Sequence, residues 1–290
     1  MFLRIAHRTR YDYSQPVTFA PHAIYLRPRE NQRQRLHEFS LEIAPAARRV
    51  ATNDPLDNAL DWAFFTNAAP AAQLEIRSQL LVETFDANPF DFFLKPSALH
   101  FPFTYDPAEL LALAPCLTSR PDSPAAARLR AWIAENLPAP PRETISFLTA
   151  LNSTVQRTLT YNRREEPGIQ SAKETLERRS GSCRDYAVLF IELCRALGLA
   201  ARFVSGYLFE PLPLAAGTPA APAMHAWAEV YLPGGGWRGL DATRGIFCDD
   251  AFVPVAHAAV AESVNPLQGT FFGPANVFAQ LSTTLTIDKL

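Results

Sequence analysis

The chain has 290 residues, 48% of them hydrophobic, which is enough for one large core or two ordinary ones. Its formal net charge of −2 argues against a surface for nucleic acids or acidic membranes. No stretch approaches the roughly 18 consecutive apolar residues of a membrane-spanning helix. The first residues, "MFLRIAHRTRYDY", lack the apolar core of a secretory signal.

Residues 1–86 show the period-two alternation of antiparallel strands. Phe39, Leu41 and Ile43 share one face of "HEFSLEIAP", and "LEIRSQLLVETF" repeats the pattern. Turn-forming clusters such as "TNDPLDN" separate these runs. The pattern predicts a β-sandwich domain over 1–86. A structured connection is expected over 87–124, which is too apolar and aromatic for a flexible linker.

Residues 125–290 predict a second, α+β domain. Apolar residues follow helical spacing near 124–137, 142–159 and 183–197. "ARFVSGYLFE" predicts a strand, and "HAWAEVYL", the turn "PGGG" and "WRGLDAT" predict a hairpin. We therefore expect helices packed on an antiparallel sheet in this half of the chain.

The four cysteines are widely spaced and form no C-x-x-C pair or metal-finger spacing. Free thiols in a reducing cytoplasm are the simplest inference, so we expect a cytoplasmic protein. The chain also has no D-x-D-x-D-G calcium loop. We expect neither a metal ion nor any other cofactor.

Cys183 is the first residue of the predicted helix 183–197 and follows the small residues 180–182. At this position the free backbone N–H groups and the helix dipole favour a thiolate. The same N–H groups can hold an oxyanion. Cys183 is therefore a candidate nucleophile, and the alternative is a buried structural cysteine, the common fate of a free Cys.

A thiolate nucleophile needs a base, and the base needs an orienting group. His225 opens the first strand of the predicted hairpin, and Asp241 lies in the second. The sum of 225 and 241 is even, so a two- or four-residue loop would place the two side chains on opposite faces. A shared site requires a three- or five-residue connection or a bulge, which three successive glycines permit. The alternatives are a half-buried strand histidine and a turn-forming aspartate.

These residues also carry a resemblance. "SGSCRDYAVLFIELCRALGLAARFVSGYL", followed by "HAWAEVYLPGGGWRGLDAT", resembles the core of the transglutaminase-like superfamily, whose fold is shared with papain-like cysteine proteases. The resemblance implies that Cys183 is the nucleophile, His225 the general base and acid, and Asp241 the orienting carboxylate. "HRTRYDYSQPV" and "LRPRENQRQRLHEFSLEIAP" resemble the amino-terminal region of bacterial members. Asp57 replaces an expected glycine, and the segment 255–266 lacks the usual glycine-arginine-aspartate-tyrosine stretch.

Three further residues near this triad, Tyr161, Ser182 and Trp227, are candidates for contacts with the substrate or the oxyanion, and Asp185 is a fourth residue to consider. Tyr161 could donate to an oxyanion or simply pack, and Ser182 directly precedes the nucleophile. Trp227 shares the face of His225 and could shield the imidazole, although an aromatic residue in a sheet is usually part of the core. Asp185, in the first helical turn, is either a structural carboxylate or a site residue.

The resemblance implies acyl transfer from a peptide or amide through a Cys183 thioester. Hydrolysis would make the protein a peptidase or amidase, and transfer to an amine would make it transglutaminase-like; the sequence leaves both open. The expected partners are a peptide or protein substrate and, for transfer, an amine acceptor, with no nucleic acid or membrane. One alternative is a non-catalytic binding protein with a vestigial triad. A zinc site is another, although zinc ligands are usually more closely spaced.

Overall fold

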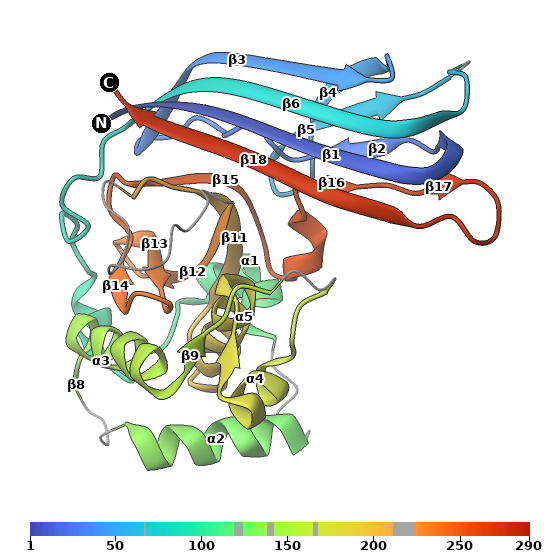
Figure 1. The fold of residues 1–290 in the computed structure, drawn as a ribbon. Coiled ribbons are helices and arrows are strands. Elements are labelled where there is room, and N and C mark those ends of the chain that lie inside the picture. Colours follow the sequence, from blue (N-terminus) through green and yellow to red (C-terminus); the bar gives the residue numbers. More distant parts are fainter. Residues whose placement is uncertain (67, 119–123, 138–141, 165–167, 211–223) are drawn as a thin grey trace.

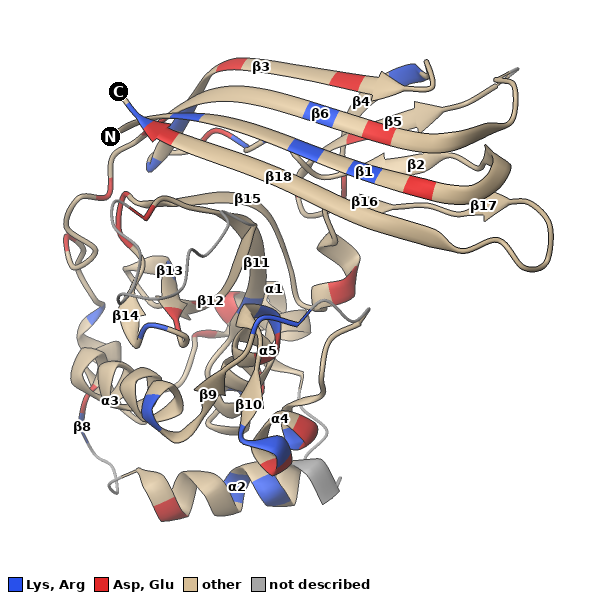
Figure 2. Ribbon diagram, viewed as in Figure 1, with Lys and Arg blue, Asp and Glu red and all other residues tan. Residues whose placement is uncertain are grey.

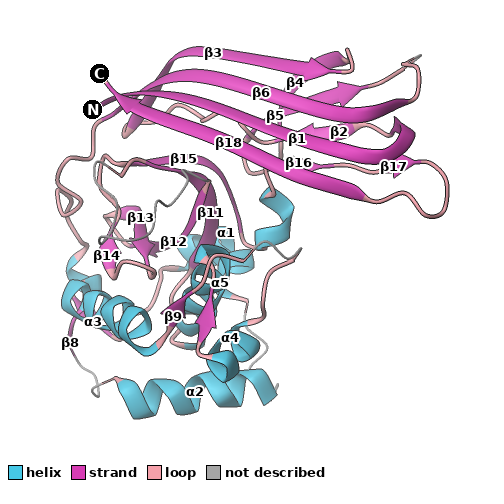
Figure 3. Cartoon of the chain, in the orientation of Figure 1, coloured by secondary structure: helices cyan, strands magenta, loops and turns pink. Residues whose placement is uncertain are grey.

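The computed structural model of the protein describes residues 1–66, 68–118, 124–137, 142–164, 168–210 and 224–290. Two layers of antiparallel strands lie against a unit of helices and sheet, and the two ends of the chain lie close together (Figure 1). The helices gather in this second unit (Figure 3). The α+β fold class expected from the sequence is confirmed.

The sandwich consists of two sheets. The first contains β3 (Gln34–Ala44), β6 (Ala71–Thr84), β1 (Phe2–Phe19), β18 (Ala279–Lys289) and β17 (Phe271–Phe272). The second contains β16 (Leu267–Gln268), β2 (His22–Ile24), β5 (Ala59–Phe64) and β4 (Arg48–Asn53). Every pairing within them is antiparallel.

The two faces of the first sheet differ in polarity, as the alternation predicts. Leu3 and Ile5 of β1 are buried opposite Val82 and Leu80 of β6. Charged residues of both signs line the same strands (Figure 2). Among them, the Arg8 guanidinium pairs with the Glu75 carboxylate on the adjacent strand. The charged face therefore carries cross-strand pairs rather than a field of one sign.

The carboxyl-terminal strands correct the predicted domain division. The sequence pattern predicts a second domain over all of 125–290. In the structure, β18 pairs with β1 in an unbroken register from Leu3↔Lys289 to Tyr13↔Ala279. β17 pairs with the last residues of β1. Residues 267–289 therefore supply strands to the sandwich, and both ends of the chain meet in one sheet.

The connection between the two units contains a helix that the sequence pattern does not predict. It holds η1 (Pro96–Ala98), β7 (His100–Phe101) and α1 (Pro107–Leu117), and its last residues, 119–123, lie outside the described part of the chain. Asp106 caps α1 by accepting a hydrogen bond from the Glu109 N–H at 2.9 Å, and Pro107 occupies the first helical position.

The second unit combines a five-stranded sheet with four helices. The sheet has the order β14 (Ile246–Phe247), β13 (Gly236–Asp241), β12 (His225–Leu232), β11 (Ala201–Leu208) and β15 (Phe252–Ala258). The helices are α2 (Pro124–Asn136), α3 (Thr144–Thr158), α4 (Ala172–Arg178) and α5 (Cys183–Ala196). Short elements complete the unit: β8 (Arg142–Glu143), β9 (Thr160–Tyr161), β10 (Ser180–Gly181) and η2 (Ala261–Val264).

Helix α5 is the centre of this unit. Its inward side chains, including Leu189, Phe190 and Leu193, are fully buried, and it packs against β11 and β12. Ala228 and Val230 lie on the packed face of β12 and belong to the same core cluster. The packing fixes the start of α5 against the start of β12.

None of the helices that the structure describes is long and apolar enough to cross a membrane.

Polar side chains tie the sandwich to the second unit. The Asn58 amide donates to the His257 carbonyl at 2.8 Å and accepts from the His257 N–H at 2.9 Å. His7 Nδ1 lies 3.1 Å from the Tyr207 hydroxyl in a buried contact. One apolar core cluster also contains residues of both units. The sandwich is therefore packed firmly on β11 and β15.

Candidate active site

Cys183 begins α5, as the sequence predicts. Ser182 holds the N-cap position with extended backbone angles (φ −84°, ψ 176°). Because Cys183 is the first helical residue, its N–H has no acceptor within the helix and is available to a ligand. The thiol therefore lies beside free donors at the positive end of the helix dipole.

Asp185 has a structural role beneath this helix start. Its buried carboxylate accepts from the Ser182 N–H (2.7 Å), the Ser182 hydroxyl (2.9 Å) and the Gln170 N–H (2.7 Å), and it pairs with Arg164 (2.9 Å). Burial raises the pKa of Asp185, but these donors outweigh it and hold the pKa below its ordinary value. A Cβ on Gly181 would lie 2.7 Å from the Asp185 Cβ. The glycine thus makes room for Asp185.

The hairpin has the connection that the parity argument requires. Leu232 pairs with Gly236, so the loop between β12 and β13 has three residues. Gly234 and Gly236 have positive φ angles of 87° and 71°, which the absence of a side chain permits. His225 and Asp241 consequently share one face, and His225 Nε2 lies 2.8 Å from Asp241 Oδ2.

Proton positions follow from this contact. An ionised carboxylate can only accept, so Nε2 carries a proton in this contact, and the second ring nitrogen, Nδ1, is not used in it. The fully buried Asp241 uses its other oxygen, Oδ1, to accept from the Thr243 N–H (2.9 Å) and hydroxyl (2.7 Å). The carboxylate is thereby held with one oxygen toward the imidazole.

Cys183 and His225 each shift the pKa of the other. Burial raises the pKa of the Cys183 thiol, but a hydrogen bond from His225, the imidazole charge and the Ala226 N–H together bring it below the ordinary value of 9.0. Burial lowers the pKa of His225, whereas Asp241 and Cys183 raise it more strongly. The pair therefore favours thiolate and imidazolium. Burial instead raises the pKa of the other thiols, Cys116, Cys194 and Cys248.

The three other candidates have different surroundings. Tyr161 on β9 pairs with Gly181 and is 49% exposed; burial of its hydroxyl raises its pKa to about 12, and the nearby Cys183 adds to this rise. Trp227 is buried, with its ring 6.3 Å from that of His225 at an angle of 28°. The Ser182 hydroxyl is occupied by Asp185. Of the three, only Tyr161 presents a substantial free surface beside the nucleophile.

Gly206 and Phe252 complete the wall around His225 and were not identified from the sequence. The Phe252 ring lies 6.2 Å from His225 and 5.3 Å from Trp227. Gly206 pairs with His225, and a Cβ there would come within 2.3 Å of the Val253 carbonyl oxygen and 2.6 Å of the Trp227 ring. In the sequence, Gly206 is visible only as the glycine of "RFVSGY". The contacts in the folded chain show that this position has no room for a side chain.

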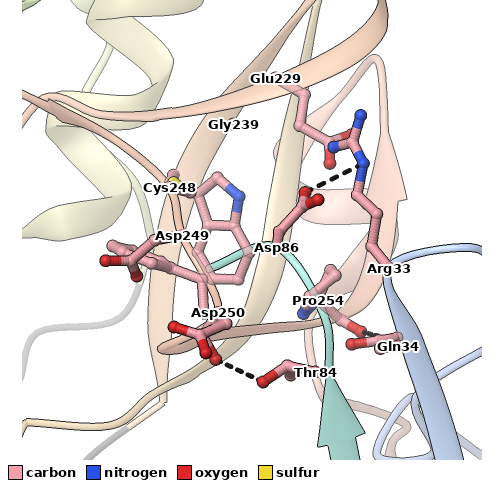
Figure 4. A pocket seen from close by; sticks show the side chains of 12 residues that line it. Arg33, Gln34, Thr84, Asp86, Glu229, Gly239, Cys248, Asp249, Asp250 and Pro254 are labelled. Atoms are coloured by element: carbon pink, nitrogen blue, oxygen red, sulfur yellow. Dashed lines mark hydrogen bonds and ion pairs between the residues drawn. The ribbon is translucent and has the colours of Figure 1, made fainter. Parts of the chain in front are cut away.

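A separate polar cavity lies beside Trp227, between the sandwich and the second unit (Figure 4). Arg33, Thr84 and Asp86 line it from the first half, with Glu229 and Asp250 from the second. Arg33 pairs with Asp86 at 3.1 Å, and the Thr84 hydroxyl donates to the Asp250 carbonyl at 2.6 Å. The triad residues do not line it, so it is part of the seam between the units.

A zinc site is an alternative role for Cys183, His225 and Asp241. In the part of the chain that the structure describes, no group of three or more His, Cys, Asp or Glu side chains is arranged to hold a metal ion. His225 instead contacts Asp241 at 2.8 Å, and it lies close enough to Cys183 to lower the pKa of that thiol.

The chain is similar to known proteins over nearly all of its length. Uncharacterized proteins of Mycobacterium tuberculosis and Mycobacterium bovis are 32% identical over 278 residues, covering 93% of this chain and 87% of theirs. An uncharacterized protein of Mycobacterium leprae is 26% identical, with 93% of both chains covered. The crystal structure of a candidate cysteine protease from Cytophaga hutchinsonii shares the fold, with a TM-score of 0.72 at 20% identity over 100% of this chain and 91% of that one.

Two family models match separate parts of the chain. Residues 131–242 match the transglutaminase-like superfamily, and this range contains Cys183, His225 and Asp241. Residues 3–83 match the bacterial transglutaminase-like N-terminal region, which here forms the strands β1 to β6. The chain therefore belongs to the transglutaminase-like superfamily and carries the N-terminal region of its bacterial members.

Proposed function

We propose that this protein is a cysteine-dependent acyl-transfer enzyme that acts on peptide or amide bonds through a Cys183 thioester. Two observations support the proposal: the 2.8 Å contact between His225 and Asp241, and a Cys183 thiol at the start of α5 whose pKa His225 lowers. A nucleophile, a base and an orienting carboxylate in hydrogen-bond contact are the parts that covalent acyl transfer needs.

The reaction follows from the protonation of the pair. The Cys183 thiolate attacks the substrate carbonyl carbon, and the free N–H at the helix start stabilises the developing oxyanion. The His225 imidazolium then protonates the leaving amine as the C–N bond breaks, which leaves a thioester on Cys183 and a neutral imidazole. Asp241 holds the imidazole with Nδ1 toward the sulfur throughout both steps.

The second half of the reaction begins with a nucleophile that gives its proton to the neutral His225. That nucleophile attacks the thioester carbon, and the C–S bond breaks to return the Cys183 thiolate beside a His225 imidazolium. Water gives a carboxylic acid, and a primary amine gives a new amide. We propose a peptide or protein as the substrate and place its acyl part beside the exposed Tyr161. We also propose a cytoplasmic location, because the four cysteines form no disulfide.

Mass spectrometry of a peptide library incubated with the protein, with and without added primary amine, tests the proposal. We expect products that depend on Cys183 and are lost in Cys183→Ala. Cleaved peptides alone would assign hydrolysis under these conditions, whereas amine-bearing peptides would assign transfer. Unchanged libraries in both arms, with the folded wild-type protein, would favour the non-catalytic binding role.

A further inference from the structure

Thr243 makes two hydrogen bonds to the carboxylate that orients the imidazole. Its N–H and its hydroxyl lie 2.9 and 2.7 Å from Asp241 Oδ1, and Oδ2 of the same carboxylate meets His225. Thr243 follows Asp241 by two residues, in the turn between β13 and β14. A side chain outside the triad thus holds the oxygen that His225 does not use.

The backbone around Asp241 is held as well. The Asp241 carbonyl accepts from the Gly245 N–H at 2.8 Å, and the buried Asn152 on α3 donates to the same carbonyl at 3.4 Å. These bonds fix where the residue lies. They leave the rotation of its carboxylate about the Cβ–Cγ bond free, because none of them reaches Oδ1 or Oδ2.

The rotation matters because the carboxylate sets the imidazole. If it turns, Oδ2 moves away from Nε2, and the ring loses the contact that directs Nδ1 toward Cys183. Arg244 Nε lies 3.9 Å from the same Oδ2 and is an alternative partner for a carboxylate that has turned. The Thr243 hydroxyl opposes that turn through a short bond to the opposite oxygen.

We infer that Thr243 is a positioning residue of the active site: its hydroxyl locks the Asp241 carboxylate so that Oδ2 faces His225. The inference rests on the proposed function for its consequence in catalysis, but the lock itself is a property of the resting protein. The N–H bond to Oδ1 is typical of an aspartate turn and survives any side-chain change. The hydroxyl bond is therefore the part that substitution can isolate.

The first test is nuclear magnetic resonance of the His225 Nε2 proton in a Cys183→Ser background, where no acyl chemistry takes place. In this background we expect a sharp, strongly downfield signal that is retained in Thr243→Ser and lost or broadened by exchange in Thr243→Val. Thr144→Val is the matched control, because it also removes a buried hydroxyl, which donates to the Ala98 carbonyl at 2.6 Å, far along the chain from Asp241. It should keep the signal.

The second test measures the rate at which iodoacetamide alkylates Cys183 at neutral pH in the otherwise wild-type chain. Loss of a hydrogen bond to a buried carboxylate should slow alkylation by about tenfold in Thr243→Val and leave Thr243→Ser close to wild type. Thr243→Ala is the second variant in case valine prevents folding. A folded Thr243→Val or Thr243→Ala protein that keeps both the proton signal and the wild-type rate would overturn the inference. If Cys183 proves unreactive in the wild type as well, the proposed function fails while the proton signal still tests the lock.

Discussion

His225 and Asp241 lie on one face of the β12–β13 hairpin and are joined by a 2.8 Å contact between Nε2 and Oδ2. The contact depends on the three-residue loop, because a loop of two or four residues would turn one of the side chains to the other face. Helix α5 brings the Cys183 thiol close enough to His225 for the imidazole to lower the thiol pKa. The length of the loop between β12 and β13 thus decides whether Asp241 can hold the imidazole beside that thiol.

Alkylation of Cys183 should depend on pH in a way that reveals the ion pair. The Cys183 pKa lies below 9.0 in the folded protein, so the thiolate forms at a lower pH than in an ordinary cysteine. The midpoint of the iodoacetamide rate against pH should therefore lie below 9. In His225→Ala the lowering partner is gone while burial still raises the thiol pKa, so the midpoint should move to or above 9. An unchanged midpoint in this variant would count against the pair.

Asp241→Asn should weaken the nucleophile while leaving the fold in place. An amide keeps the shape but removes the charge that raises the His225 pKa, so the imidazolium and the thiolate both become less favourable. We expect the alkylation rate of Cys183 at pH 7 to fall by about tenfold or more. Circular dichroism should report an unchanged secondary structure. A wild-type rate in the folded variant would contradict the orienting role.

Asp185→Asn should lower stability because it removes a buried charge that satisfies several donors. We expect a loss of about 3–5 kcal/mol in the free energy of unfolding, measured by urea denaturation. Asp57→Asn is the control, since the Asp57 side chain is 72% exposed. It should change stability by less than about 0.5 kcal/mol.

Asp185→Asn should also change how the free energy of unfolding depends on pH. The folded pKa of Asp185 is lowered, so its contribution is full above the unfolded value of about 4 and is lost as the pH falls through the folded pKa. Asp185→Asn should therefore lose less stability than the wild type on acidification. An equal loss in both proteins would show that the carboxylate is not held in this way.

Leu285 and Leu281 test the assignment of β18 to the sandwich. Both lie on β18 and face the same side, but Leu285 is 4% exposed within the main core and Leu281 is 55% exposed. Leu285→Ala should cost about 2–4 kcal/mol of unfolding free energy, and Leu281→Ala should cost much less. Equal effects of the two substitutions would contradict the pairing of β18 with β1.

The sequence predicts those parts of the molecule whose signals are local. The alternation in 74–82 and the helical spacing after Cys183 both appear in the structure because each element buries one face of its own. The position of Cys183 at a helix start follows from the same periodicity. The index parity of His225 and Asp241 limits the loop length before any coordinate is known.

Other features depend on partners that are distant in the chain. The pairing of β18 with β1 joins residues more than 260 positions apart, and nothing in "STTLTI" indicates which strand it meets. The sequence pattern does not predict α1, because the apolar residues of this helix fall on several of its sides and Pro115 lies within it, although "DPAE" is a recognisable start. The role of Gly206 comes from a ring and a carbonyl that only folding brings near it.

The most direct test of the account is the relative rate at which iodoacetamide labels the four cysteines near neutral pH, read by mass spectrometry. Cys183 should react much faster than Cys116, Cys194 and Cys248, whose pKa values are raised by burial. In His225→Ala this preference should disappear. Comparable labelling of Cys183 and the other three thiols in the wild type, or a preference that survives His225→Ala, would contradict the claim that His225 activates Cys183.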